Sequence, residues 1–228
     1  MPKVLKAKWV ENNAKLFKTS KGKYRVLGFG IPADTDFTHK GEKHNTCPKA
    51  LACKAVCYAK QGRYVMDNVV QARKHNLRMS LRPTFVRHMI ADLNQMVVRS
   101  KVCRKPYNVV RLHDSGDFYS QEYLNAWATI AATFPDVIFY AYTKSLHLDM
   151  TAIPSNLRIT RSQGGKLDKL INLGLPNSRI FSSHAARKRE KYVDGNLSDI
   201  PAIEGKTSIG LMYHGNRGLT KSQIKFFG

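Results

Sequence analysis

Short apolar runs alternate with amphipathic segments through most of this sequence, and this alternation restricts the possible folds more than any other feature. Five runs fall in the second half of the chain and one, YRVLGFGI at 24–31, precedes them; the five are VVRL (109–112), VIFYAY (137–142), LRIT (157–160), RIFS (179–182) and SIGLMY (208–213). Strands that alternate with helices pair in parallel through right-handed crossovers. We therefore predict one α/β domain over residues 24–228, built as a partial (β/α)6 barrel or an open parallel sheet.

The segments between these runs carry helical patterns. In residues 120–134 Ser120 is a suitable N-cap, and the apolar residues recur on one face. Apolar residues recur every four positions over 66–99, where Pro83 predicts a break. Residues 166–175 predict a shorter helix that ends at a glycine.

The chain is strongly basic. Its 228 residues include 38 Lys and Arg against 16 Asp and Glu, a formal net charge of +22. Such an excess attracts polyanions, so we expect a nucleic acid, DNA or RNA, or a nucleotide as the partner. Residues 1–23 are rich in lysine and predict a basic N-terminal arm.

No apolar stretch is long enough to span a bilayer, and the first residues lack the apolar segment of a secretory signal. We therefore expect no membrane association and a cytoplasmic location.

Three of the four cysteines, Cys47, Cys53 and Cys57, lie within eleven residues in the spacing C-x5-C-x3-C. Three thiolates from one loop can hold three irons of a [4Fe–4S] cluster and leave the fourth iron open, or bind zinc with one further ligand. Cys103, His39 and His44 are the candidates for that further ligand. A zinc ribbon would need two CxxC pairs, so the spacing favours the cluster.

Polar residues follow every one of the five later runs. The carboxyl ends of parallel strands meet at one edge, so these side chains should converge near the cysteine loop. They are His113, Asp114, Ser115, Gly116 and Asp117; Thr143, Lys144 and Ser145; Arg161, Ser162 and Gln163; Ser183 and His184; and His214.

Roles for these residues follow from their chemistry. His113 and His184 can move protons, and Asp114 with Asp117 can bind a divalent cation, which would suit a metal-dependent nuclease. Cationic side chains can hold a phosphate or carboxylate group. The candidates are Arg111, Lys144 and Arg161, with Lys60 and Arg63 beside the cysteines.

The order of a first strand, a three-cysteine loop and a second strand ending in Ser115-Gly116-Asp117 resembles the radical S-adenosylmethionine enzymes. Their usual spacing is C-x3-C-x2-C, and Lys60 stands where the third cysteine would fall, so Cys47 would supply the third thiolate. The resemblance implies a radical-SAM-like barrel, a [4Fe–4S] cluster and S-adenosylmethionine. It also implies that the cofactor is met by Ser115, Gly116 and Asp117, and Ser145, Arg161 and Ser162 are further candidates at the same edge.

A second resemblance covers roughly residues 45–215. The TCP…C…CYA motif, the segment HDSGDFYSQEYLNAW and the strand end FYAYTKS are similar to the phage gene product 88 family. This implies a phage origin, and hence the cytoplasm of a host, but brings no established reaction.

Two functions remain open from the sequence. The first is an iron–sulfur enzyme, radical-SAM-like, that acts on nucleic acid or a nucleotide. The second is a non-catalytic nucleic-acid-binding or host-takeover protein in which zinc or a cluster only stiffens a loop. The polar residues at the strand ends favour the enzyme, because a pure binder would carry Lys and Arg there.

Overall fold

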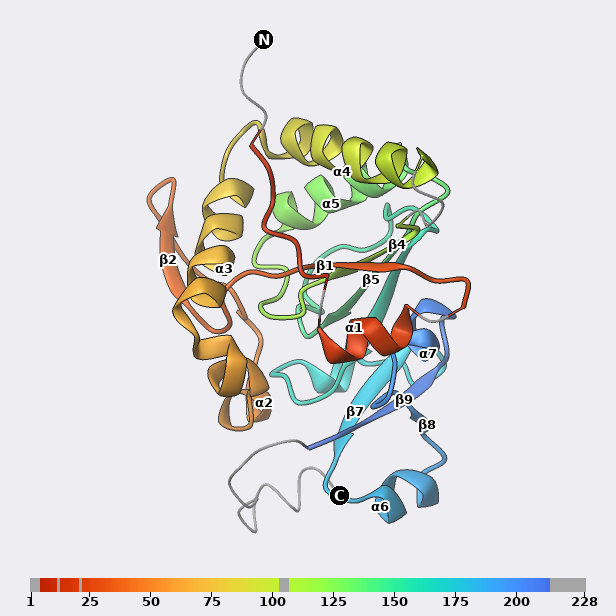
Figure 1. Cartoon of the computed structure of the whole chain (residues 1–228). Coiled ribbons are helices and arrows are strands. Elements are labelled where there is room, and N and C mark those ends of the chain that lie inside the picture. The colour runs from red at the N-terminus through yellow and green to blue at the C-terminus, as the bar shows by residue number, and fades with distance from the viewer. Residues whose placement is uncertain (1–4, 12, 21, 103–106, 214–228) are drawn as a thin grey trace.

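The central feature of the molecule is a seven-stranded parallel sheet that curls into a half-barrel (Figure 1). A computed structural model of the chain describes residues 5–11, 13–20, 22–102 and 107–213. The strands, in their order across the sheet, are β1 (Val26–Phe29), β4 (Val109–Leu112), β5 (Ile138–Thr143), β6 (Leu157–Ser162), β7 (Asn177–Phe181), β9 (Ser208–Met212) and β8 (Val193–Asp194). All six predicted strands are confirmed, and β8 was missed because two residues carry no periodicity.

One face of the sheet is covered by three helices, α3 (Asp67–Ser80), α4 (Phe85–Val102) and α5 (Gln121–Thr133). The break between α3 and α4 spans Pro83, as predicted. The Ser120 side chain accepts a hydrogen bond from the Tyr123 N–H at 3.2 Å, which confirms the predicted N-cap of α5. Trp127 of α5 is fully buried, and its ring lies 4.9 Å from that of Phe29 on β1.

The inner face of the curl has a separate core, covered by α1 (Ala14–Thr19) and α7 (Ile200–Ile203). Successive side chains of a strand point to opposite faces, so Val109 joins this core while Val110 joins the helical one. Leu16 of α1 is fully buried here, and Val10 pairs antiparallel with Gly28 of β1. The described residues of the expected basic arm therefore pack onto the domain (Figure 1).

The connection from β1 to α3 contains an unpredicted hairpin of β2 (Asp36–His39) and β3 (Glu42–Asn45). Its turn residues Lys40 and Gly41 both have positive φ, 51° and 82°, as the tight turns of two-residue hairpins require. The chain then forms α2 (Ala52–Ala55) and the short 3-10 helices η1 (Tyr58–Lys60) and η2 (Gly62–Val65).

The helix predicted at 166–175 is wrong. Only the 3-10 turn η3 (Asp168–Leu170) forms, and α6 (His184–Arg189) comes only after β7. The Asp168 carboxylate accepts hydrogen bonds from the N–H groups of Gly164 and Gly165, both at 2.8 Å, which fixes a turn. Leu170 and Leu173 are 54% and 61% exposed, so an α-helix here would have no face to bury.

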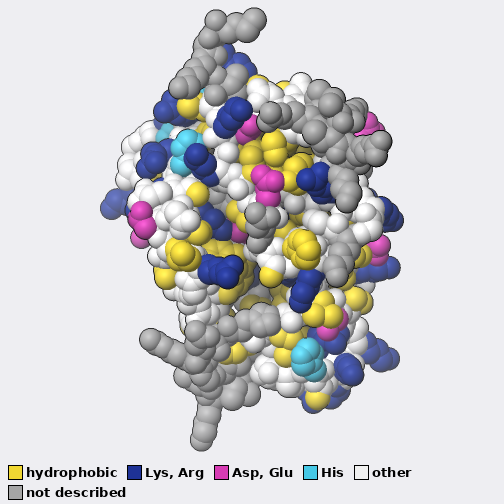
Figure 2. Space-filling model, in the orientation of Figure 1, with side chains coloured by type: hydrophobic (Ala, Val, Ile, Leu, Met, Phe, Trp, Pro, Cys, Tyr) yellow, Lys and Arg dark blue, Asp and Glu magenta, His cyan; other side chains and the backbone are white. Residues whose placement is uncertain are grey.

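The surface has no dominant patch on the face drawn in Figure 2. Lys and Arg side chains are scattered there among apolar and uncharged ones. Within the described residues, no helix combines the length and apolar character needed to cross a membrane.

Candidate thiol-lined active site

The cysteine loop, residues 46–57, is attached to the carboxyl ends of two strands. Next to β4, the Asp117 N–H donates to the Thr46 carbonyl at 2.7 Å. Next to β6, the Gly164 carbonyl accepts the Cys53 N–H at 3.3 Å. Because both anchors lie at the same sheet edge, the loop is held over the open end of the half-barrel.

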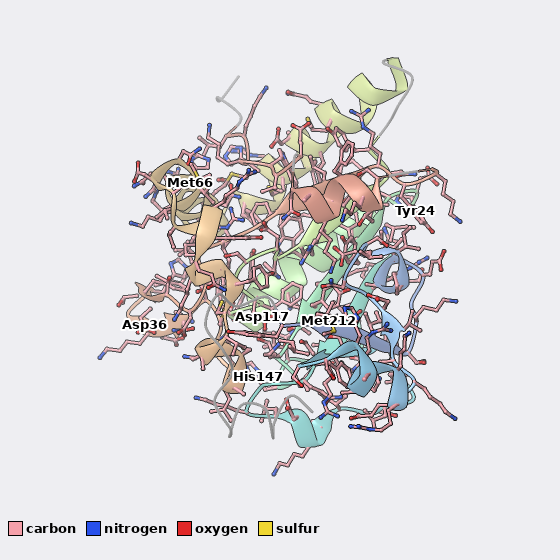
Figure 3. The ribbon with its side chains drawn as sticks, turned by 60° about the horizontal axis from the view of Figure 1, so that its bottom comes forward. Tyr24, Asp36, Met66, Asp117, His147 and Met212 are labelled. Carbon is pink, nitrogen blue, oxygen red and sulfur yellow. The ribbon has the colours of Figure 1, made fainter. Side chains whose placement is uncertain are left out.

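A cavity of about 480 Å³ lies between this loop and the sheet. Its volume is within the range of small-molecule sites. Figure 3 looks toward this end, with Asp117 and Met212 near its centre. Of the residues predicted from sequence, the lining contains Cys47, Cys53, Cys57, Arg111, His113, Ser115, Gly116, Asp117, Lys144 and Ser162.

The thiols are partly buried and influence one another. Burial raises the pKa of Cys47 to about 12, helped by Asp117 and by the other two cysteines, although its sulfur accepts the Asp34 N–H at 3.3 Å. Burial also raises the pKa of Cys57, and a hydrogen bond with the Ala59 backbone opposes this. The Cys47 and Cys57 thiols therefore stay protonated near neutral pH unless a cationic group replaces the proton.

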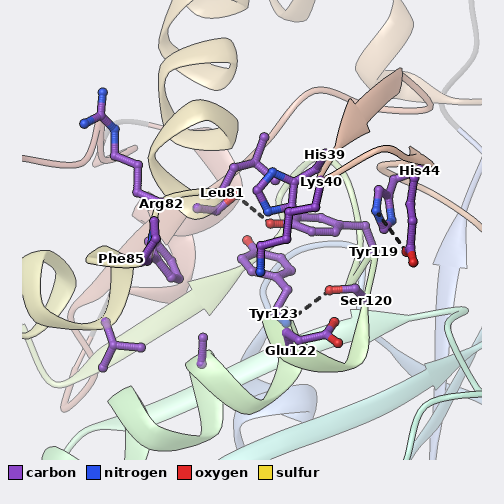
Figure 4. A pocket seen from close by; sticks show the side chains of 15 residues that line it. His39, Lys40, His44, Leu81, Arg82, Phe85, Tyr119, Ser120, Glu122 and Tyr123 are labelled. Carbon is purple, nitrogen blue, oxygen red and sulfur yellow. Dashed lines mark hydrogen bonds and ion pairs between the residues drawn. The ribbon is translucent and has the colours of Figure 1, made fainter.

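All three cysteines line the cavity. Over the described ranges, no three His, Cys, Asp or Glu side chains form a group that could hold a metal ion. His39 and His44 lie on the β2–β3 hairpin and line a different groove, of about 340 Å³, together with Tyr119 and Tyr123 (Figure 4). Cys103 and His214 lie outside the described residues.

The turn after β4 has a fixed shape. Gly116 has φ of 85°, and a Cβ there would lie 2.3 Å from the Ile31 side chain, so only glycine fits. The Asp117 carboxylate accepts the Thr143 hydroxyl at 2.5 Å and the Lys144 N–H at 2.8 Å. Burial raises the pKa of Asp117 despite these donors.

Comparison with known proteins identifies the family. A sequence model of the family described as gene product 88 matches residues 4–219, nearly the whole chain. The chain belongs to the gene product 88 family. It is 29% identical over 218 residues to the Gene 88 protein of Mycobacterium phage L5, covering 86% of each chain. It is 30% identical over 155 residues to the Gene 88 protein of Mycobacterium phage D29, covering 60% of this chain and 61% of the relative. No solved structure matches it significantly.

Lys144 lines the same cavity as the three cysteines in this member of the gene product 88 family. Its Nζ donates to the Ser162 hydroxyl at 2.7 Å, and no carboxylate of the described residues lies within ion-pair distance of it. A hydroxyl does not neutralise an ammonium group. Lys144 is therefore able to bind an anionic group of a ligand.

His113 is a neutral imidazole that lies in the cavity wall. Burial lowers its pKa to about 3. Nε2 lies 3.1 Å from the Tyr123 hydroxyl, while Nδ1 has no hydrogen-bond partner among the described residues. At neutral pH the ring can exchange a proton with a ligand only through such an unpaired nitrogen.

The sequence reasoning missed a buried charge network around Asp199. Its carboxylate accepts from Lys15 at 2.8 Å and from Arg111 at 2.9 Å, and the hydroxyls of Tyr140 and Tyr142 donate at 3.0 and 3.2 Å. Burial acts to raise the pKa of Asp199, but Arg111 and Lys15 outweigh it and hold the pKa at about 2. The only signal in the sequence was Arg111 inside an apolar strand, because a buried charge needs a partner.

The two aspartates expected to share a cation do not face each other. The Asp114 carboxylate pairs with Arg73 of α3 at 2.5 Å, and Asp114 does not line the cavity, whereas Asp117 does. Gly30 packs directly against Asp114, since a Cβ there would lie 2.0 Å from the carboxylate.

Five further predicted site residues also lie away from the cavity. The Ser145 hydroxyl donates to the Phe118 carbonyl at 2.7 Å, and Lys60 pairs with Asp34 at 2.7 Å. The other three are Arg161, which is half-buried, and Arg63 and His184, which are exposed.

Proposed function

We propose that this protein is an iron–sulfur enzyme, radical-SAM-like, that acts on nucleic acid or a nucleotide. Cys47, Cys53 and Cys57 would hold a [4Fe–4S] cluster. The observation that supports this most is that all three thiols line one cavity together with the strand-end residues of β4, β5 and β6.

The cysteine spacing favours a cluster over a zinc ribbon, because a zinc ribbon needs two CxxC pairs and the loop has C-x5-C-x3-C. A [4Fe–4S] core binds each thiolate through a different iron, so its ligands stand farther apart. The backbone N–H of Asp34 donates to the Cys47 sulfur, and hydrogen bonds to ligand sulfurs tune the reduction potential of an iron–sulfur cluster.

When bound, a cluster of this kind would supply electrons for reductive cleavage of S-adenosylmethionine. The chain itself would orient the cofactor and exclude water. Lys144 would bind a carboxylate through its ammonium group, and Ser115 and Asp117 line the same cavity. His113, uncharged at neutral pH, lines the same cavity.

Anaerobic purification tests the cluster. We expect brown protein with about four irons and four sulfides per chain, because a [4Fe–4S] cluster contains four of each. Cys53→Ala should lose the colour and most of the iron, while Cys103→Ala serves as the matched cysteine control and should keep both.

Incubation of the loaded protein with S-adenosylmethionine and a reductant should release 5′-deoxyadenosine. Zinc without iron, or a cluster with no cofactor cleavage, would contradict the enzyme.

The alternative is a non-catalytic nucleic-acid-binding or host-takeover protein. It is favoured by the internal hydrogen bonds of Ser115 and Ser145, which donate to the carbonyls of Ile31 and Phe118 at 2.7 Å and so stiffen the turns. A chain that contains structural zinc, binds nucleic acid and never cleaves the cofactor would fit this function.

A further inference from the structure

We infer that the end of the cavity beside α1 binds the phosphate group of a nucleotide, through Lys15 and Arg111. This inference names a substrate class for the proposed function. Only the reaction that the nucleotide would undergo depends on the proposed function. The binding site itself is formed by residues remote from the cysteines in sequence.

This end of the cavity has an excess of positive charge. Lys15 and Arg111 both line the cavity, and among the described residues the one carboxylate that either of them pairs with is that of Asp199. Asp199 also accepts the hydroxyls of Tyr140 and Tyr142, so its oxygens are fully engaged. Two cations and one anion leave one positive charge in a site where burial weakens screening.

Arg111 has hydrogen-bonding capacity that the protein does not use. Its side chain is 8% exposed, and one nitrogen, Nη1, binds Asp199 at 2.9 Å. Its Nε–H has no partner within the described part of the chain. A buried donor without a partner is costly, so an oxyanion that accepts from Arg111 regains this energy. Lys15 uses one of its three donors on Asp199 and is 22% exposed, so a ligand can reach it.

The neighbouring walls suit the rest of a nucleotide. Tyr142 presents its ring 5.8 Å from the Lys15 ammonium and 5.9 Å from the Arg111 guanidinium. Ile180, Leu211 and Met212 continue the lining as apolar side chains on β7 and β9. A charged end beside an aromatic and apolar wall matches a phosphate attached to a base. A cavity of about 480 Å³ has the size of a small-molecule site, so a single nucleotide fits the inference better than a duplex.

Lys15→Gln tests the subsite, because it removes one phosphate contact while Arg111 keeps its bond to Asp199. Titration calorimetry would measure binding of a panel of nucleoside 5′-monophosphates and of the corresponding nucleosides. We expect Lys15→Gln to weaken binding of the best monophosphate by about tenfold or more, as loss of a charge-assisted hydrogen bond implies. Binding of the nucleoside should not change. Lys18→Gln, on the same helix but outside the cavity lining, removes the same charge and should leave both affinities within about twofold.

Three further measurements decide the outcome. Lys15→Arg keeps the charge and should bind the monophosphate, which separates loss of charge from loss of fold. Inorganic phosphate should compete with the nucleotide, and stronger competition by a dicarboxylate such as succinate would overturn the phosphate assignment. The titrations are repeated in Cys53→Ala, which cannot assemble the proposed cluster: Lys15-dependent binding there would support this inference independently of the cluster, whereas wild-type protein that binds the monophosphate but never takes up iron would contradict the cluster alone. Equal losses in Lys15→Gln and Lys18→Gln, or no binding of any monophosphate, would overturn the inference.

Discussion

Three polar residues lie within or directly after strand β4, and each is buried with a different partner. Arg111 reaches Asp199 inside the curl, His113 contacts Tyr123, and Asp114 pairs with Arg73 of α3. His113 has φ of 60°, which ends the regular alternation of the strand and places the imidazole beside the cavity. Burial of several polar groups at one strand end costs stability, and binding sites commonly bear that cost.

His113 should make the protein sensitive to acid. Its pKa is about 3 in the fold and near 6.5 in the unfolded chain, so between these values the unfolded state binds the extra proton. The free energy of unfolding should therefore fall as the pH drops from about 7 to about 5.5, by about 1 kcal/mol from this group. His113→Asn, which tolerates a positive φ, should lose that part of the pH dependence in urea unfolding curves.

The comparison needs both proteins at both pH values. Burial raises the pKa values of Asp114 and Asp117, so these groups favour the fold at low pH, opposite in sign to His113. They are present in wild type and variant and cancel in the difference. An identical pH dependence in the two proteins would show that His113 titrates normally in the fold.

At the scale of elements, the position of the cysteine loop depends on close backbone contact with the segment after β6. Ala50 forms an antiparallel bridge with Gly165, and the Lys166 N–H donates to the Lys49 carbonyl at 2.8 Å. A Cβ on Gly165 would lie 2.9 Å from that same carbonyl oxygen, which is backbone and cannot rotate away. Gly165 therefore allows the loop to approach the sheet edge.

Gly165→Ala should loosen the loop. Overpacking of this kind costs about 1–3 kcal/mol, so the opening equilibrium of the loop should rise by about fivefold or more. We expect the thiols of iron-free protein to react correspondingly faster with Ellman's reagent. Gly174→Ala is the matched control, because Gly174 is exposed and lies in the same connection between β6 and β7. Equal thiol reactivity in the two variants would contradict this account of how the loop is held.

The sequence predicts those elements whose pattern is local. VVRL coincides with β4, and the Ser120 cap with its apolar face locates α5, because propensity, capping and burial agree there. At 166–175 they disagree: the leucines match a helix, but Asp168 and the preceding glycines fix a turn. The hairpin was missed because its strands are polar and short, although Lys40-Gly41 carried a weak turn signal.

The site was predictable only in part, because only some of its residues belong to local sequence patterns. Strand order and the rule that strand ends meet at one edge place Cys47, Asp117 and Lys144 around one cavity. The network of Lys15, Arg111 and Asp199 joins α1, β4 and the start of α7, which lie far apart in the chain. No local pattern relates such residues, so only the fold reveals them.

At the scale of the whole molecule, the excess of positive charge is carried by exposed residues and not by buried ones. Among the residues whose burial the structure describes, four of the 16 acidic residues of the chain are buried (Asp92, Asp114, Asp117 and Asp199), as are three arginines (Arg73, Arg111 and Arg187). Burial therefore removes nearly equal charge of both signs from the described surface and does not offset the net charge of +22. On the face drawn in Figure 2 the cations are scattered, so we expect contact of that face with a polyanion to be diffuse and not specific for sequence.

Binding of nucleic acid should therefore depend steeply on salt. Fluorescence anisotropy with labelled single-stranded DNA and RNA should show affinity falling at least about tenfold between 50 and 200 mM salt, because each neutralised phosphate releases counterions. Lys18→Gln and Lys15→Gln should each change this affinity by less than about twofold, since one charge among many contributes little to a diffuse contact. The surface contact and the Lys15–Arg111 subsite thus respond differently to the same substitution. A flat response to salt would show that the surface charge does not engage a polyanion, even if single nucleotides bind in the cavity.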